Sequence, residues 1–215
     1  MYAPRPFREE RRNVLLTTIR SLKLAAIVIR EDGRFSVAQV PVLVREGDDP
    51  EAARIEFHVA LGNPFWREVR DGCDALLMMQ GPHAYIHPGW YETKKQTGKA
   101  VPTWNYVTVH AEGRLSVHRG RDWLVRHLEA LTHENESGRP DEWTLADAPP
   151  DYLDRQMKGI VGLELSIDRL EGVWKMIQHH PDANKLGVIE ALSESARPQD
   201  RQVARIMQSL VRQTD

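Results

Sequence analysis

Aromatic and cationic side chains are concentrated between residues 87 and 106, where the chain reads HPGWYETKKQTGKAVPTWNY. A flat anionic ligand needs apolar or aromatic walls, and its phosphate needs Lys, hydroxyl or backbone N–H donors. Candidate walls are Trp90, Tyr91 and Trp104, and candidate donors are Lys94, Lys99 and Thr103. A packed hairpin with a solvated lysine loop explains the same residues, so composition leaves both interpretations open.

The nine histidines raise the question of a metal site. His83 and His87 share one face of a predicted strand, but residues four apart on a strand are separated by about 13 Å. Neither this pair nor the adjacent His179 and His180 has a Cys, Asp or Glu companion at a familiar ligand spacing. We therefore expect no metal. A helical pattern carries His127 and His133, which we interpret as ordinary surface or boundary residues.

The composition is that of a globular protein, with 41% hydrophobic residues, 28% charged residues and a net charge of −2. Such a balance does not favour strong nonspecific binding to DNA. The apolar runs are too short to cross a bilayer, and the N-terminal segment lacks the apolar core of a signal peptide. The single cysteine, Cys73, excludes an internal disulfide. These features predict a cytoplasmic protein without a membrane partner.

Motifs that would identify an enzyme are absent. The chain has no G-x-S-x-G, H-E-x-x-H, P-loop or Rossmann glycine pattern. Its carboxylates are scattered, and none pairs visibly with a histidine in the sequence. Because catalytic groups are assembled in space, this leaves the catalytic residues unknown and the question of enzyme activity open.

Short strands dominate the first 118 residues. Strand patterns cover residues 24–29, 35–44, 54–60, 74–81 and 83–91, and residues 101–120 alternate around Glu112-Gly113 like a hairpin. Without regular alternation of strands and helices, this order predicts an antiparallel barrel or strongly curved sheet. Pro41 marks an edge or a bulge. Exposed strand edges and the aromatic region are compatible with a homodimer.

Helical patterns cover residues 8–22, 63–72 and 122–133, and two more helices occupy the last thirty residues. The final helix carries Arg201, Arg205 and Arg212, which could read a DNA groove. Its apolar residues at helical spacing indicate a packing stripe instead: Val203, Ile206, Met207 and Leu210. Direct DNA contact is possible, but the net charge does not support it.

Longer segments carry a resemblance to a known family. GPHAYIHPGWY followed by GKAVPTWNYVTVHAEGRL resembles the signature of the PaiB-type proteins, the FMN-binding negative transcriptional regulators. The similarity extends to MYAPRPF, FHVALGNPFW, DWLVRHLEALTHENE and IVGLELSIDRLEGVWKMIQ. Residues 101–106, VPTWNY, are the most specific part of it.

The resemblance implies a mainly β, α+β fold. We expect a split β-barrel of the flavin-reductase or pyridoxamine-phosphate-oxidase kind over residues 1–170, with peripheral helices and a helical tail, 171–215, packed on the barrel. It also implies a homodimer with FMN at the subunit interface and a role as a repressor. A flavin-dependent reductase or oxidase of the same fold, or a haem-binding split barrel, is the alternative.

The expected contacts to FMN, or to a related flat anionic ligand, follow from the same resemblance. Lysines and Thr103 would hold the phosphate, and Trp104 or Trp174 would flank the ring. The chain departs from the family pattern at 38–41, 61, 86–91 and 172–179. Several of these changes remove donors or cations of the kind that hold phosphate, and His87 and His179 could compensate. The predicted contact residues are His58, Lys94, Thr103, Trp104, Asn105, Trp174 and Lys175.

Overall fold

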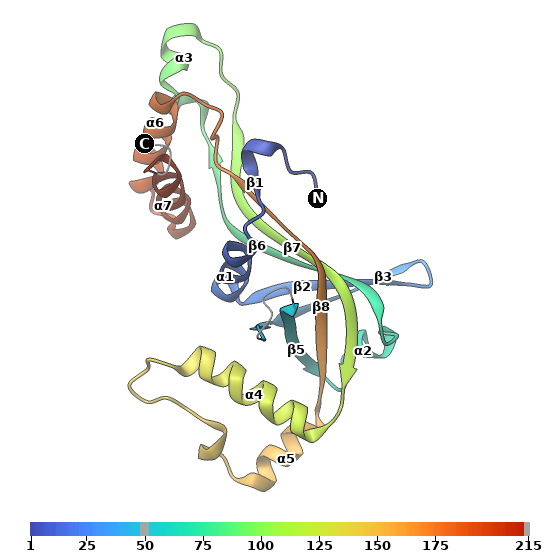
Figure 1. Ribbon diagram of the computed structural model, residues 1–215. Coiled ribbons are helices and arrows are strands. Elements are labelled where there is room, and N and C mark those ends of the chain that lie inside the picture. The colour runs from blue at the N-terminus through green and yellow to red at the C-terminus, as the bar shows by residue number, and fades with distance from the viewer. Residues whose placement is uncertain (48–51, 213–215) are drawn as a thin grey trace. The chain divides into compact units, whose positions relative to one another are not determined.

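A computed structural model describes residues 1–47 and 52–212 (Figure 1). The strands are β1 (Arg8–Glu9), β2 (Leu24–Glu31), β3 (Arg34–Pro41), β4 (Leu43–Arg45), β5 (Arg54–Ala60), β6 (Cys73–Ile86), β7 (Thr103–His118) and β8 (Ile160–Lys175). The α-helices are α1 (Arg12–Leu22), α2 (Phe65–Glu68), α3 (Glu92–Thr97), α4 (Arg121–Glu136), α5 (Pro150–Lys158), α6 (Asp182–Ser193) and α7 (Pro198–Arg212).

The strands form one sheet in the order β3-β2-β6-β7-β8-β5-β4, and β1 pairs with β8. β2 pairs antiparallel with β3 and β6, and β5 pairs antiparallel with β4 and β8. This confirms the predicted mainly β, antiparallel α+β fold.

Alternating side chains give β5 and β8 one apolar and one polar face. On one face Ile55, Phe57 and Val59 oppose Leu165, Leu163 and Val161, and all six are buried. Burial of this apolar face stabilises the folded protein by about 1.5–3 kcal/mol for each large side chain. The other face carries Glu56 and His58 opposite Glu164 and Gly162. Buried polar groups of this kind need hydrogen-bond partners.

The chain divides into two compact units. Unit 1 comprises residues 1–11, 80–109 and 171–215, and unit 2 comprises residues 12–79 and 110–170. Within unit 1, α3, α6 and α7 gather beside the ends of β6 and β7 (Figure 1). Its core contains Ile86, Tyr91, Val107, Val188 and Met207, among others. The apolar stripe of α7 packs there, as its helical spacing predicts.

The hairpin predicted at Glu112-Gly113 and the break predicted between the strands 74–81 and 83–91 are both wrong. β7 passes through Glu112-Gly113 without a hairpin, and β6 passes through Gly81-Pro82 without a break. A Cβ on Gly113 would lie 1.8 Å from the Ser166 backbone oxygen, and a Cβ on Gly81 would lie 3.0 Å from Val107 Cβ. These glycines therefore permit a close approach to a neighbour within each unit and do not reverse the chain.

The segment predicted to continue as a strand to residue 91 and then to form a lysine loop is also different. A short 3-10 helix, Pro88–Trp90, leads into α3, which carries Lys94 and Lys95. Gly98 ends α3 in the left-handed conformation (φ 69°) and donates its N–H to the Lys94 carbonyl. Among the described residues, no helix has both the length and the apolar character needed to cross a membrane.

Candidate functional site

A cavity of about 560 Å³ in unit 1 is lined by two predicted contact residues that lie far apart in the sequence, Thr103 and Lys175. We call it the lysine–histidine cavity. Its walls include apolar side chains from Phe7, Tyr91, Val101, Pro102 and Ile177. Its polar lining includes Lys99, Thr103, Lys175, His179, His180 and Asn184. The volume falls within the range of about 300–1,000 Å³ that is usual for small-molecule sites.

Lys175 is the best-positioned cation of this cavity. Its ammonium donates to Thr103 Oγ1 and, over 2.7 Å, to the Trp104 carbonyl oxygen. Both acceptors are neutral, and within the described part of the chain no carboxylate forms an ion pair with Lys175. Burial lowers the pKa of this ammonium. A half-buried cation with only neutral partners favours an anion as its third hydrogen-bond partner.

His180 strengthens the same preference. Its ring packs against Tyr91 with centroids 5.0 Å apart. Burial lowers the pKa of His180, and the neighbouring charges of His179 and Lys175 lower it further. An anion bound beside these groups would offset the repulsion between them. Of the two histidines expected to compensate for the missing phosphate donors, His179 lines the cavity and His87 does not.

Tyr91 lines the cavity and also carries an unsatisfied polar atom. Its ring is 2% exposed, and its hydroxyl is buried without a hydrogen-bond partner among the described residues. Burial raises the pKa of the phenol. A buried hydroxyl without a partner costs about 1–3 kcal/mol, unless a ligand atom completes it.

Removing that hydroxyl should stabilise the ligand-free protein. We expect Tyr91→Phe to raise the free energy of unfolding by about 1 kcal/mol in urea titrations, because Phe keeps the packing and loses the unpaired group. Tyr152→Phe is the matched control, since Tyr152 is 48% exposed and should change nothing measurable. A destabilised Tyr91→Phe variant would show that the hydroxyl is already satisfied.

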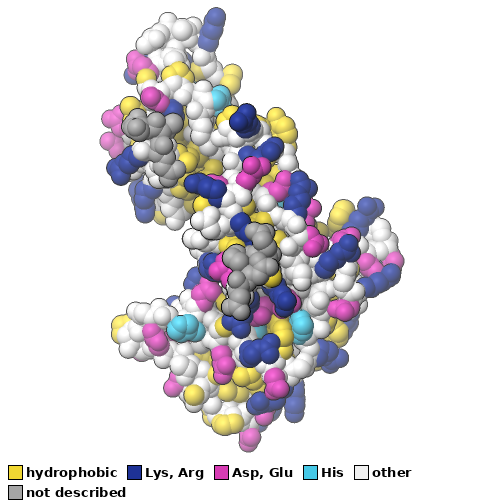
Figure 2. All heavy atoms as spheres, in the orientation of Figure 1, with side chains coloured by type: hydrophobic (Ala, Val, Ile, Leu, Met, Phe, Trp, Pro, Cys, Tyr) yellow, Lys and Arg dark blue, Asp and Glu magenta, His cyan; other side chains and the backbone are white. Residues whose placement is uncertain are grey.

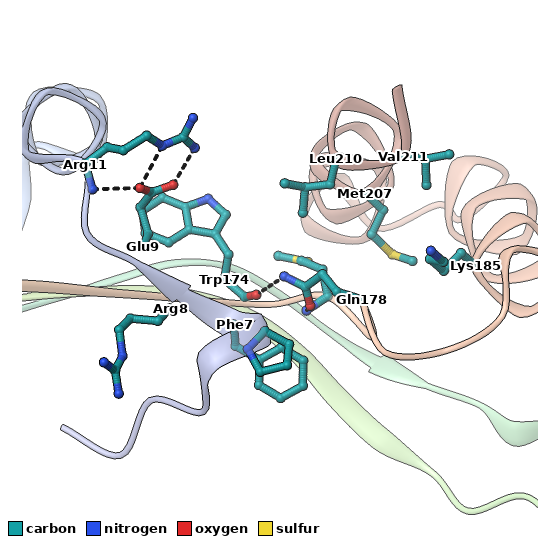
Figure 3. A pocket seen from close by; sticks show the side chains of 12 residues that line it. Phe7, Arg8, Glu9, Arg11, Trp174, Gln178, Lys185, Met207, Leu210 and Val211 are labelled. Carbon is teal, nitrogen blue, oxygen red and sulfur yellow. Dashed lines mark hydrogen bonds and ion pairs between the residues drawn. The ribbon is translucent and has the colours of Figure 1, made fainter. Parts of the chain in front are cut away.

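Trp174 lines a second cavity of unit 1, of about 280 Å³, which we call the tryptophan cavity. Figure 3 shows the Glu9 carboxylate held by Arg11, with hydrogen bonds of 2.9 and 2.6 Å from its Nε and an Nη. The helical side is formed by Met207 and Leu210. This cavity is half the size of the lysine–histidine cavity, and its carboxylate is paired with Arg11. It suits a flavin less well.

Three predicted residues of unit 1 line neither cavity. Lys94 is exposed on α3. Trp104 is 49% exposed, with its ring 5.8 Å from that of Tyr85, and its carbonyl accepts a hydrogen bond from Lys175. Asn105 is fully buried and donates from Nδ2 to Met207 Sδ over 3.3 Å. Thr103 and Lys175 are the predicted contacts that the lysine–histidine cavity unites.

His58 belongs to unit 2 and lines neither cavity of unit 1. Its Nδ1 lies 3.0 Å from His127 Nε2, and His127 Nδ1 lies 3.3 Å from Glu56 Oε2. The interpretation of His127 as a surface or boundary residue is wrong, because its side chain is fully buried. In the sequence, the burial of His127 was indicated by its spacing from Trp123, one turn away on α4. Within residues 1–47 and 52–212, no three His, Cys, Asp or Glu side chains are grouped to hold a metal.

Comparison with known proteins identifies the family. Residues 1–169 match the family model described as "Putative FMN-binding domain". The chain is also 30% identical, over 97% of its own length and 97% of the relative's, to "Protease synthase and sporulation protein PAI 2" from Bacillus subtilis. The chain belongs to this FMN-binding domain family, of the PaiB type. The resemblance read from VPTWNY and the flanking segments is thereby confirmed.

Solved structures support the fold. The FAD and heme binding protein from Mycobacterium smegmatis matches with a TM-score of 0.58 and 18% identity, covering 78% of this chain and 73% of the other. The flavocytochrome Anf3 from Azotobacter vinelandii matches with a TM-score of 0.59 and 14% identity, covering 78% and 69%. These likenesses confirm the split-barrel fold for this PaiB-type chain. The domain boundary predicted at residue 170 stays a prediction.

Proposed function

We propose that this PaiB-type chain binds FMN in the lysine–histidine cavity and acts as a negative regulator of transcription. Lys175 carries the proposal, because it is a half-buried cation whose partners are neutral. Lys175, Lys99 and Thr103 would hold the phosphate, and the Tyr91 ring would form part of the wall against the ligand. Bound FMN supplies a ring that can accept and donate electrons.

Replacing Lys175 tests this directly. We expect Lys175→Met to weaken FMN binding at least tenfold, because a hydrogen bond to a charged group contributes about 1.5–3 kcal/mol. Riboflavin, which lacks the phosphate, should bind both proteins equally. Titration of the purified chain with each flavin, followed by flavin fluorescence, measures both affinities.

Lys95→Met is the matched control, since Lys95 is exposed on α3 and paired with Glu92 at 2.7 Å. Wild-type protein that gains no flavin absorbance with FMN would overturn the proposal. Rapid reduction of the bound flavin by NADH would assign a reductase instead of a purely regulatory flavoprotein. A Soret band after haem titration would assign the haem-binding alternative.

We also propose a homodimer formed through the outer face of the β2–β3 hairpin. Leu24, Phe35 and Val37 are 59%, 72% and 57% exposed on that hairpin. Exposed apolar side chains grouped on one sheet face are typical of a protein interface. A species of twice the monomer mass in sedimentation velocity would support the dimer. A species of 24.7 kDa at all protein concentrations would contradict it.

Regulation through DNA has weaker structural support. Lys and Arg lie intermixed with Asp and Glu over the face shown in Figure 2. On α7, Arg205 and Arg212 are exposed, whereas Arg201 donates to the Ser195 carbonyl over 2.6 Å. We propose that the protein is cytoplasmic and regulates through its ligand state. Retardation of a target promoter fragment at low salt would show direct DNA contact, and fractionation of cells would test the location.

A further inference from the structure

Three titratable side chains of unit 2 form a linear network that the flavin proposal does not use. Glu56 and His58 point from the same face of β5 toward α4, which contributes His127. The carboxylate lies 3.3 Å from His127 Nδ1, and the next link, from His127 Nε2 to His58 Nδ1, is 3.0 Å. Arg45 completes the buried end, with its Nε 3.4 Å from the second carboxylate oxygen.

Packing fixes this geometry. Trp123 stacks on the His127 ring at 5.1 Å and 18°, and on the His118 ring at 4.5 Å and 3°. The indole also lies directly over Gly162, where a Cβ would come within 2.1 Å of the ring. His127 is therefore held in one orientation by a stack that leaves no room for another side chain at position 162.

The charges assign a role to each group. Burial alone would raise the pKa of Glu56, but the hydrogen bond with His127 and the charge of Arg45 together lower it. Glu56 is thus an anion that orients the Nδ1–H of His127. Burial and the neighbouring His127 lower the pKa of His58 to about 4. His58 is therefore neutral near pH 7. If neutral His127 uses its Nδ1–H for Glu56, its Nε2 can accept, and His58 Nδ1 is then the donor of this hydrogen bond.

The outer end of the network is open. With its Nδ1 used, His58 keeps an unshared electron pair on Nε2, and this atom has no partner among the described residues. Nε2 of His118 is buried without a partner, whereas Nε2 of His58 is not closed off from solvent. A network serving only to anchor α4 would not require an accessible ring nitrogen. A nucleophile, a base within hydrogen-bond reach and a third group that orients the base together match the arrangement of covalent catalysis.

We propose that His58 Nε2 is the nucleophile of a second site, which accepts acyl groups from activated esters of small carboxylic acids. Nε2 bonds to the carbonyl carbon while the bond to the leaving oxygen breaks and that oxygen departs with the electron pair. The Nδ1 proton of His58 passes to His127 Nε2, where Glu56 stabilises the imidazolium. Water then displaces the acyl group as its acid, His127 returns the proton to His58, and the second proton of water goes to solvent.

Hydrolysis of p-nitrophenyl acetate by the full-length chain tests this site. We expect His58→Gln to remove at least nine-tenths of the protein-dependent release of nitrophenolate. His127→Gln should lower it about tenfold, because Gln still accepts the hydrogen bond from His58 but cannot take the proton. His133→Gln, an exposed histidine of the same helix, should keep the wild-type rate. Peptide mass spectrometry after acid quenching should find the acetyl group on His58.

Equal rates for His58→Gln and the wild type would overturn the site, and an unchanged rate for His127→Gln would overturn the relay. The wild type supplies an independent test should a variant fail to fold. With less than one equivalent of reagent, His58 should be the first histidine acetylated, and prior labelling of His83, His87 or His133 would contradict the proposal. Binding of FMN is unaffected by any of these outcomes, so the two proposals fail separately.

Discussion

Gly113→Ala should destabilise the protein by at least about 3 kcal/mol, or prevent its folding. A Cβ at this position would lie 1.8 Å from the Ser166 backbone oxygen and 2.9 Å from the adjoining carbon. Both strands, β7 and β8, are central in the sheet, so the backbone cannot move away without disturbing their neighbours. Overpacking against backbone is one of the mechanisms by which a single substitution causes a large loss of stability. Urea denaturation followed by circular dichroism measures the loss.

Gly62→Ala is the matched control. Nothing lies within 4 Å of a Cβ at Gly62, and its φ is outside the left-handed region. Its unfolding free energy should stay within about 1 kcal/mol of the wild type. A Gly113→Ala protein as stable as this control would mean that β7 and β8 are not in close contact here.

Gly113 also shows why part of the fold could not be predicted from sequence. Period-two alternation on both sides of Glu112-Gly113 correctly predicted strands, but the dipeptide is equally typical of a turn and of a close approach between strands. Only the position of Ser166, more than fifty residues later, decides between them. The antiparallel class needed no such information, because strand number and spacing already favoured it.

The lysine–histidine cavity and the network of Glu56, His58 and His127 also differ in how far the sequence could predict them. Thr103 and Lys175 were predictable through the family resemblance, which covers both segments, and the cavity unites them. The network of Glu56, His58 and His127 requires α4 to lie over β5, and no sequence spacing between residues 58 and 127 records that. Burial of His127 depends on Gly162 admitting Trp123, which is again a contact between distant segments.

The second large effect is a loss of stability in mild acid. His58 has a pKa of about 4 in the folded protein, against an ordinary value of 6.5. Between these values the unfolded chain binds more protons than the folded one, so stability is complete above pH 6.5 and falls as the pH falls toward 4. From pH 6.5 to 4.5 the loss should be about 2 kcal/mol. Urea denaturation at several pH values gives the slope.

The variant His58→Gln should lose most of this slope, because Gln does not titrate. The window ends at pH 4.5 because the pKa of Glu56 is lowered from 4.5, so its own contribution is lost only at lower pH, with the same sign. His180, whose pKa burial also lowers, retains a smaller slope in the variant. His133→Gln should reproduce the wild-type curve. Identical slopes in the wild type and His58→Gln would show that His58 binds protons equally in the folded and unfolded chains, which would remove the basis for its neutrality in the network.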